Sequence, residues 1–94
     1  MVFGSGKYFG QLKNGEPNGY GRAKYSIMRY EGHWKDCLRH GPGIEIYDNG
    51  AFFDGLFAHG LRKGYGTFYY ADGSRKSGIW SGKTMQEYGT ESNV

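Results

Sequence analysis

The sequence predicts an all-β fold, an elongated and twisted single-layer antiparallel sheet of consecutive β-hairpins with no helix of note. Glycine recurs at a regular interval, at Gly10, Gly32, Gly55 and Gly78, which are 22, 23 and 23 residues apart. Aromatic residues recur around these glycines with a period of two, which is the period of a β-strand. No segment carries the 3.6-residue apolar stripe of a helix, so the repeated unit is a pair of strands.

The composition is that of a small ordered domain. Glycine accounts for 18 of the 94 residues, yet aromatic residues reach 18%, and disordered chains are poor in aromatic residues. The net charge of +3 permits weak attraction to anionic surfaces without requiring it. Cys37 is the single cysteine and cannot form an internal disulfide. Because we also find no secretory signal and no apolar run long enough to span a membrane, we expect a cytoplasmic protein.

The first strand of each repeat is marked by the pattern aromatic-x-Gly-x-aromatic, as in F-D-G-L-F at residues 53–57. A period of two places both rings and the glycine on one face of a strand. Two residues before the glycine stand Tyr8, Tyr30, Phe53 and Lys76, and two residues after it stand Leu12, Trp34, Phe57 and Trp80.

The second strand is marked by Gly-x-Gly, followed four residues later by a tyrosine. The second glycine is Gly21, Gly43, Gly66 and Gly89, and the tyrosines are Tyr25, Tyr47 and Tyr70. Segments 44–47 and 67–70 are rich in the β-branched and aromatic residues that favour strands. We expect turns at 14–18 and 58–63 within the hairpins, and tight joins at 48–50 and 71–74 between them. The join around 26–28 is one residue shorter and lacks its glycine, so we expect a different turn there.

These columns divide one domain into a half repeat at 1–7, repeats at about 8–29, 30–52 and 53–75, and a degraded capping repeat at 76–94. We expect roughly seven strands. Because glycine inside a strand normally weakens it, we interpret the strand glycines as flat seats on which aromatic rings pack.

The columns resemble the MORN repeat (membrane occupation and recognition nexus), whose pattern is Y-x-G-x-W followed by G-x-G. The resemblance extends from residue 8 to residue 89, and the chain departs from the pattern at Cys37, Lys76 and Glu87. It implies an open array of hairpins that serves as an interaction module or scaffold in cytoskeletal and ciliary assemblies. The resemblance also implies a link to phospholipids, because some members have one.

No catalytic, metal or cofactor site is predicted. His33, His40 and His59 lie in different columns, without the paired ligand clusters of a zinc site. The segment G-K-T at 82–84 matches only the end of a phosphate-binding loop, because Ser77 stands where the first glycine is required. A single-layer sheet offers no enclosed pocket, so we expect a protein that is not an enzyme.

The leading hypothesis is a protein–protein interaction adaptor that binds a partner peptide or helix on the aromatic face of the sheet. A single layer leaves one face without a covering layer, and exposed apolar surface indicates a binding site. The alternative interpretation of these rings is a core that holds the sheet together. The predicted contact residues are Tyr8, Tyr25, Tyr30, Trp34, Tyr47, Phe53, Phe57, Tyr70 and Trp80. Whether the tyrosines of the second strands share this face depends on the strand register.

A competing hypothesis is a peripheral membrane module that binds anionic phospholipids through basic loops. Its candidate residues are Arg39, Arg62, Lys63, Arg75 and Lys76. Each basic side chain is worth about 1 kcal/mol at an anionic surface, so binding without an apolar anchor is weak. Nucleic acid is not expected, because acidic residues interrupt the basic ones. The strands near residues 3 and 90 would end the sheet with unpaired edges, which are open to self-association.

Overall fold

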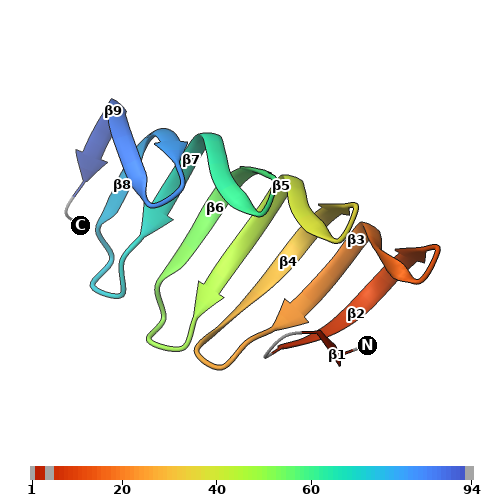
Figure 1. Cartoon of the computed structure of the whole chain (residues 1–94). Coiled ribbons are helices and arrows are strands. Elements are labelled where there is room, and N and C mark those ends of the chain that lie inside the picture. Colours follow the sequence, from red (N-terminus) through yellow and green to blue (C-terminus); the bar gives the residue numbers. More distant parts are fainter. Residues whose placement is uncertain (1, 4–5, 93–94) are drawn as a thin grey trace.

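The computed structural model describes residues 2–3 and 6–92, which form one open antiparallel sheet (Figure 1). The strands lie side by side in chain order: β1 (Val2–Phe3), β2 (Gly6–Lys13), β3 (Glu16–Lys24), β4 (Met28–Lys35), β5 (Leu38–Tyr47), β6 (Phe52–Ala58), β7 (Leu61–Tyr69), β8 (Arg75–Ser81) and β9 (Thr84–Ser92). The molecule measures 43 × 24 × 17 Å, and the described residues form no helix. The predicted fold class is confirmed.

The predicted number of about seven strands is wrong, since the described residues form nine. The repeats predict the first strands β2, β4, β6 and β8 and the second strands β3, β5 and β7. The edge strands predicted near residues 3 and 90 are β1, which has two residues, and β9, which forms a full strand beside β8.

The hairpin turns are shorter than predicted. Segments 14–18 and 58–63 contract to the two-residue turns Asn14–Gly15, with φ of 53° and 79°, and His59–Gly60, with φ of 53° and 84°. Asp36–Cys37 forms the equivalent turn with φ of 51° and 71°. Two-residue turns with positive φ at both positions match the right-handed twist of the strands they join. The residues around these turns therefore belong to strands.

The joins between hairpins follow the prediction. The amide of Tyr25 donates to the carbonyl of Met28, three residues on, at 2.8 Å. In the two later joins the amides of Tyr47 and Tyr70 donate to Ala51 and Ser74, four residues on, at 2.9 and 2.8 Å. The first join is therefore one residue shorter and forms a different turn.

Each of the first three hairpins carries a bulge beside its paired glycines. In the third hairpin Gly55 pairs with Gly66 and Phe57 pairs with Arg62, so two steps along β6 correspond to four along β7. The extra residues are accommodated around Gly64, whose φ of 101° favours glycine.

The last hairpin shows what the bulge glycine does. Glu87 replaces this glycine in β9 and pairs regularly with Gly78, and the register shift moves to the interval between Lys76 and Gly78. A residue with a side chain disfavours positive φ, which explains why the bulge leaves this position.

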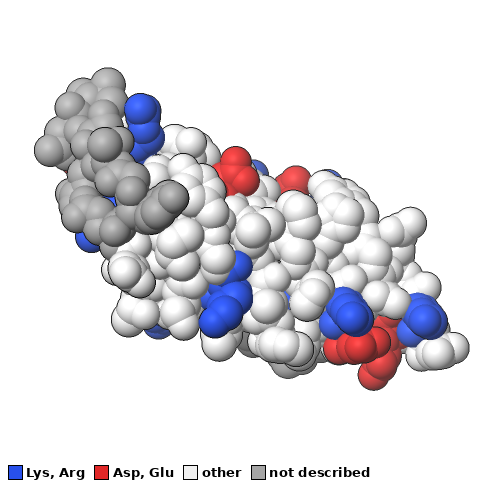
Figure 2. Space-filling model, turned by 90° about the horizontal axis from the view of Figure 1, so that it is seen from above, with Lys and Arg blue, Asp and Glu red and all other residues white. Residues whose placement is uncertain are grey.

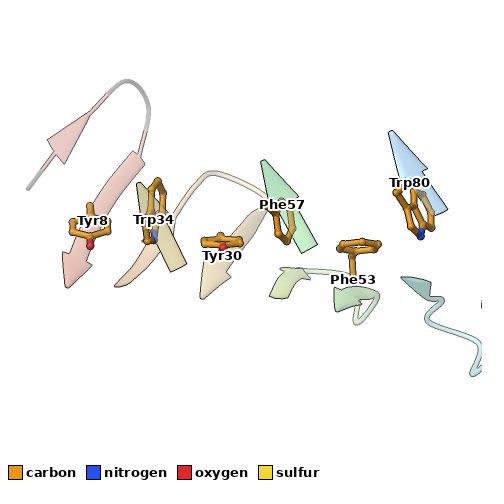
Figure 3. Packing of buried hydrophobic residues seen from close by; sticks show 7 residues of the cluster. Tyr8, Tyr30, Trp34, Phe53, Phe57 and Trp80 are labelled. Atoms are coloured by element: carbon orange, nitrogen blue, oxygen red, sulfur yellow. The ribbon is translucent and has the colours of Figure 1, made fainter. Parts of the chain in front are cut away.

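The core is a ladder of aromatic rings (Figure 3). These rings lie over the paired glycines. A side chain at Gly21, Gly43 or Gly66 would overlap the ring of Tyr8, Tyr30 or Phe53, respectively. The prediction that the glycines are seats for rings is therefore confirmed. Successive edge-to-face contacts with centroids 5.0–5.6 Å apart join Tyr8–Trp34, Trp34–Tyr30, Tyr30–Phe57, Phe57–Phe53 and Phe53–Trp80.

The indoles connect each repeat to the one before it. Trp34 Nε1 donates to the carbonyl oxygen of Gly21 at 3.1 Å, and Trp80 Nε1 donates to that of Gly66 at 3.0 Å. Phe57 holds the same column in the repeat between them and has no donor. The rings of Trp34, Phe57 and Trp80 thus each complete the core of the preceding hairpin.

Candidate interaction face

The strand register shows whether the tyrosines of the second strands share a face with the buried rings. Tyr30 pairs with Ala23 and Glu45, so alternation places Tyr47, two positions further along β5, on its face, and Tyr25 follows Ala23 in the same way just past the end of β3. The guanidinium carbon of Arg39 lies 5.4 Å from the ring centre of Tyr30 and 5.7 Å from that of Tyr25. The ring of Phe68 lies 6.0 Å from Tyr47 and 4.9 Å from Tyr70. All nine predicted contact residues, with Arg39, Glu45, Arg62 and Phe68, therefore form one surface, called here the aromatic face.

Burial divides the predicted contact residues into two groups. Tyr8, Tyr30, Trp34, Phe53, Phe57 and Trp80 are 0–6% exposed, so they form the core and present almost no surface. Tyr25 and Tyr47 are half-buried, and Tyr70 is 44% exposed. Among the predicted contact residues, those that a partner can touch are therefore Tyr25, Tyr47 and Tyr70, which form a row beside the buried rings.

A buried carboxylate ties two arginines to this face. Glu45 Oε2 accepts from Arg39 Nη1 at 2.7 Å, and Glu45 Oε1 accepts from Arg62 Nε at 2.8 Å. The hydroxyl of Tyr47 donates to Glu45 at 3.2 Å and accepts from Arg62 Nη2 at 2.9 Å. We call Arg39, Glu45, Tyr47 and Arg62 the Glu45 cluster.

The two arginines of the Glu45 cluster also cover the ladder. The guanidinium carbon of Arg62 lies 4.6 Å from the ring centre of Phe53 and 5.0 Å from that of Trp80. The guanidinium carbon of Arg39 lies 5.7 Å from the ring centre of Phe57. Guanidinium groups at these distances attract the faces of aromatic rings. The cluster thus supplies part of the covering layer that a single-layer sheet lacks.

The expectation that Arg39, Arg62 and Lys63 lie in basic loops is wrong. Arg39 lies in β5 and the other two lie in β7, because the turns before them have only two residues. Arg75 and Lys76, the remaining candidates of this set, are not in a loop either, since they begin β8. By register, Arg39, Arg62 and Lys76 lie on the aromatic face, whereas Lys63 and Arg75 lie on the other side. The five basic residues are therefore divided between two surfaces. In the view of Figure 2, acidic groups lie between basic ones and no continuous basic stripe is seen.

The phenols of the core are neutral hydrogen-bond donors. Burial raises the pKa of Tyr30 far above its ordinary value, against the opposing effect of Arg39. Its hydroxyl donates to the carbonyl oxygen of His33 at 2.9 Å. Burial likewise raises the pKa of Tyr8, whose hydroxyl donates to the carbonyl oxygen of Gln11 at 2.6 Å. These groups hold the bulges in place and offer no acid or base at neutral pH.

Two further findings concern metals and membranes. Within residues 2–3 and 6–92, no three histidine, cysteine, aspartate or glutamate side chains gather as a metal site would require. His40 and His59 form an edge-to-face pair with ring centres 5.9 Å apart. In the part of the chain that the structure describes, no helix has the length and hydrophobicity needed to cross a bilayer.

The sequence prediction missed an apolar row on the other side of the sheet, called here the opposite face. Leu56 pairs with Pro42, and Tyr65 pairs with Ile79, and all four are exposed. Tyr20 continues the row on β3. The signal was available, because Tyr20, Pro42 and Tyr65 are the residues between the two glycines of each Gly-x-Gly. Alternation places a residue between two inward-facing glycines on the outer side.

An open sheet of hairpins with a ring ladder over paired glycines defines a β-hairpin repeat protein. The family model described as "MORN repeat" matches residues 8–26, 30–52 and 53–75. The chain belongs to the MORN-repeat family. Members of this family are generally non-enzymatic modules that interact with proteins or membranes.

Proposed function

We propose that this chain is a protein–protein interaction adaptor whose aromatic face binds a peptide or helix of a partner in a larger, cytoskeletal or ciliary assembly of the cytoplasm. The observation that carries this proposal is the accessible row Tyr25, Tyr47 and Tyr70, which lies beside the arginines of the Glu45 cluster. Tyrosine and arginine are enriched among the residues that dominate binding energy at interfaces. Family membership supports the interaction role, and the assembly comes from the resemblance alone.

The row is suited to a partner that crosses the strands. Its tyrosines come one from each repeat, so they recur every second strand, at a spacing of about 9.5 Å. Two turns of an α-helix rise about 10.8 Å, so apolar side chains seven residues apart can contact successive tyrosines. The tyrosines stand beside the buried ladder, and this packing lowers the entropic cost of ordering their side chains when a partner binds.

The test compares two pairs of exposed tyrosines. Tyr25→Ala with Tyr70→Ala removes contact area from the aromatic face, and Tyr20→Ala with Tyr65→Ala removes similar rings from the opposite face. The partner protein recovered with the tagged wild-type chain should be lost with the first double variant and kept with the second. Circular dichroism confirms that both variants are folded. Equal recovery with both variants would contradict the proposed face.

The competing function is binding of anionic phospholipid by Arg39, Arg62, Lys63, Arg75 and Lys76. It has weaker support, because these residues are divided between two faces and Glu45 engages two of them. Sedimentation with phosphoinositide vesicles at low and high salt separates the two functions. The adaptor proposal expects no pelleting at either salt, whereas pelleting that salt abolishes would favour the lipid function.

A further inference from the structure

Three cations lie directly opposite one another on the opposite face, at the end of the sheet near β2. Lys7 in β2 pairs with Lys24 in β3, and Lys24 pairs with Arg29 in β4. All three side chains are exposed. Directly opposed side chains have Cβ atoms about 5 Å apart, so the row concentrates positive charge within a small area.

Little within the described residues neutralises this row. Arg29 Nε lies 3.7 Å from Glu31 Oε2, and both side chains of this pair are accessible to water. Lys24 Nζ donates to the carbonyl oxygen of Tyr25 at 3.1 Å, which leaves its charge unpaired. Like charges directly opposite in a sheet are destabilising. The arrangement therefore carries a folding cost that a bound anion would remove.

A hollow lies beside the row. Phe9, Arg22, Ala23, Lys24, Arg29 and Glu31 line it. Phe9 pairs with Arg22 and is 57% exposed, so an apolar ring stands next to the cations. Together with Lys7, the hollow thus brings four basic side chains and one carboxylate close to the exposed ring of Phe9.

We propose that this hollow binds an acidic segment of a protein, with carboxylates on Lys7, Lys24 and Arg29 and an apolar side chain on Phe9. The site lies on the face opposite the tyrosine row and does not depend on the proposed adaptor function. An anionic membrane fits it less well. Beyond the row, this face carries the carboxylates Glu31 and Asp54 and the cations Lys63 and Arg75, so a flat anionic surface laid on it would meet charges of both signs. Asp54 lies in β6, two strands beyond Arg29, and does not line the hollow.

The experiment measures fluorescence anisotropy of a labelled peptide of about ten glutamates with one central leucine. The variant is Lys24→Glu, which reverses the middle charge of the row. The matched control is Lys63→Glu, which makes the same charge change at an exposed position of β7 on the same face. Lys24→Glu should weaken binding by at least about tenfold, and Lys63→Glu by less than about twofold. Phe9→Ser should weaken binding by several-fold at unchanged net charge.

A second readout separates a binding role from a structural one. Because Lys24→Glu places an acid between two cations, it should raise Tm by about 2–4 °C while it weakens binding. Equal loss of affinity with both charge variants would overturn the proposal, since it would show attraction to net charge alone. The proposal would also be overturned if the peptide does not bind the wild-type chain. The same holds if vesicles rich in phosphatidylserine bind the chain and the peptide does not.

Discussion

The carboxylate of Glu45 lies 2.8 Å from Nε of Arg62, a residue 17 positions further along the chain, in the next hairpin. Glu45 is 7% exposed and holds Arg39 from its own strand as well, so one buried anion joins two repeats. Glu45 therefore holds both arginines in place over the ring ladder.

Glu45→Gln should destabilise the fold by about 3 kcal/mol, because two partly buried guanidinium groups lose their common anion. The measurement is urea denaturation followed by tryptophan fluorescence. Glu31→Gln is the control, since its pair with Arg29 is accessible to water and such pairs contribute about 0.5 kcal/mol. Similar losses for the two variants would mean that Glu45 is not the tie between the repeats.

Gly43→Ala should destabilise the fold by about 3 kcal/mol, because the added methyl group would overlap the buried ring of Tyr30. Gly50→Ala tests backbone conformation alone. Its φ is 96° and nothing lies within 4 Å of an added Cβ, so we expect a loss of about 1 kcal/mol. Thermal denaturation measures both. If Gly50→Ala proves the more harmful change, Gly43 is not a seat for the ring.

Cys37→Gly should stabilise the fold by about 0.5–1 kcal/mol. Cys37 adopts φ of 71° in a two-residue turn whose equivalents are Gly15 and Gly60, and a residue with a side chain is strained in this region. Cys37→Ser keeps the Cβ atom and should leave stability nearly unchanged. A gain with serine equal to that with glycine would point to the thiol rather than the backbone. Urea denaturation under reducing conditions decides.

Stability should fall as pH rises above about 10, the ordinary pKa of tyrosine. Burial raises the pKa of Tyr30 in the folded state, so its hydroxyl contributes stability that is fully present below pH 10 and is lost as pH rises toward the folded pKa. Tyr30→Phe should flatten this decline, and Phe53 in the same column shows that phenylalanine fits. The check is the free energy of unfolding of both proteins between pH 8 and 11. An equal decline in both would place the effect elsewhere.

The architecture was predictable because individual glycines and aromatic residues at fixed spacing indicate it. Glycine at the paired positions has one packing purpose, to leave room for the rings of Tyr8, Tyr30 and Phe53, and that purpose repeats with the hairpin. The period of two then determines which side chains share a face. The class of fold and the seat role of the glycines follow from these two facts.

The features that were missed depend on turn length and on contacts between hairpins. Arg39 and Arg62 were predicted to lie in long loops. In strands, side chains alternate between the two faces, and counting back by twos from Gly43 and Gly66 puts both arginines on the aromatic face. Their pairing with Glu45 needs the register of three strands, which composition does not reveal. A strand near residue 90 was predicted as an edge of the sheet, but the register of β9 was not, because a hairpin can move its bulge when Glu87 replaces the bulge glycine.

The indole of Trp34 belongs to one hairpin by covalent connection and to the preceding one by packing, and Trp80 repeats the arrangement. The hairpins of the ladder therefore form complete cores only together with their neighbours. Folding is cooperative between nearest neighbours, as in a one-dimensional chain of coupled units. The ring ladder ends in the last hairpin, where Lys76 holds the column of Tyr8, Tyr30 and Phe53 and the methionine sulfur of Met85 lies over Gly78. Unfolding should start at β8 and β9 and proceed toward β2, so that amide hydrogen exchange slows from that end toward the middle of the array.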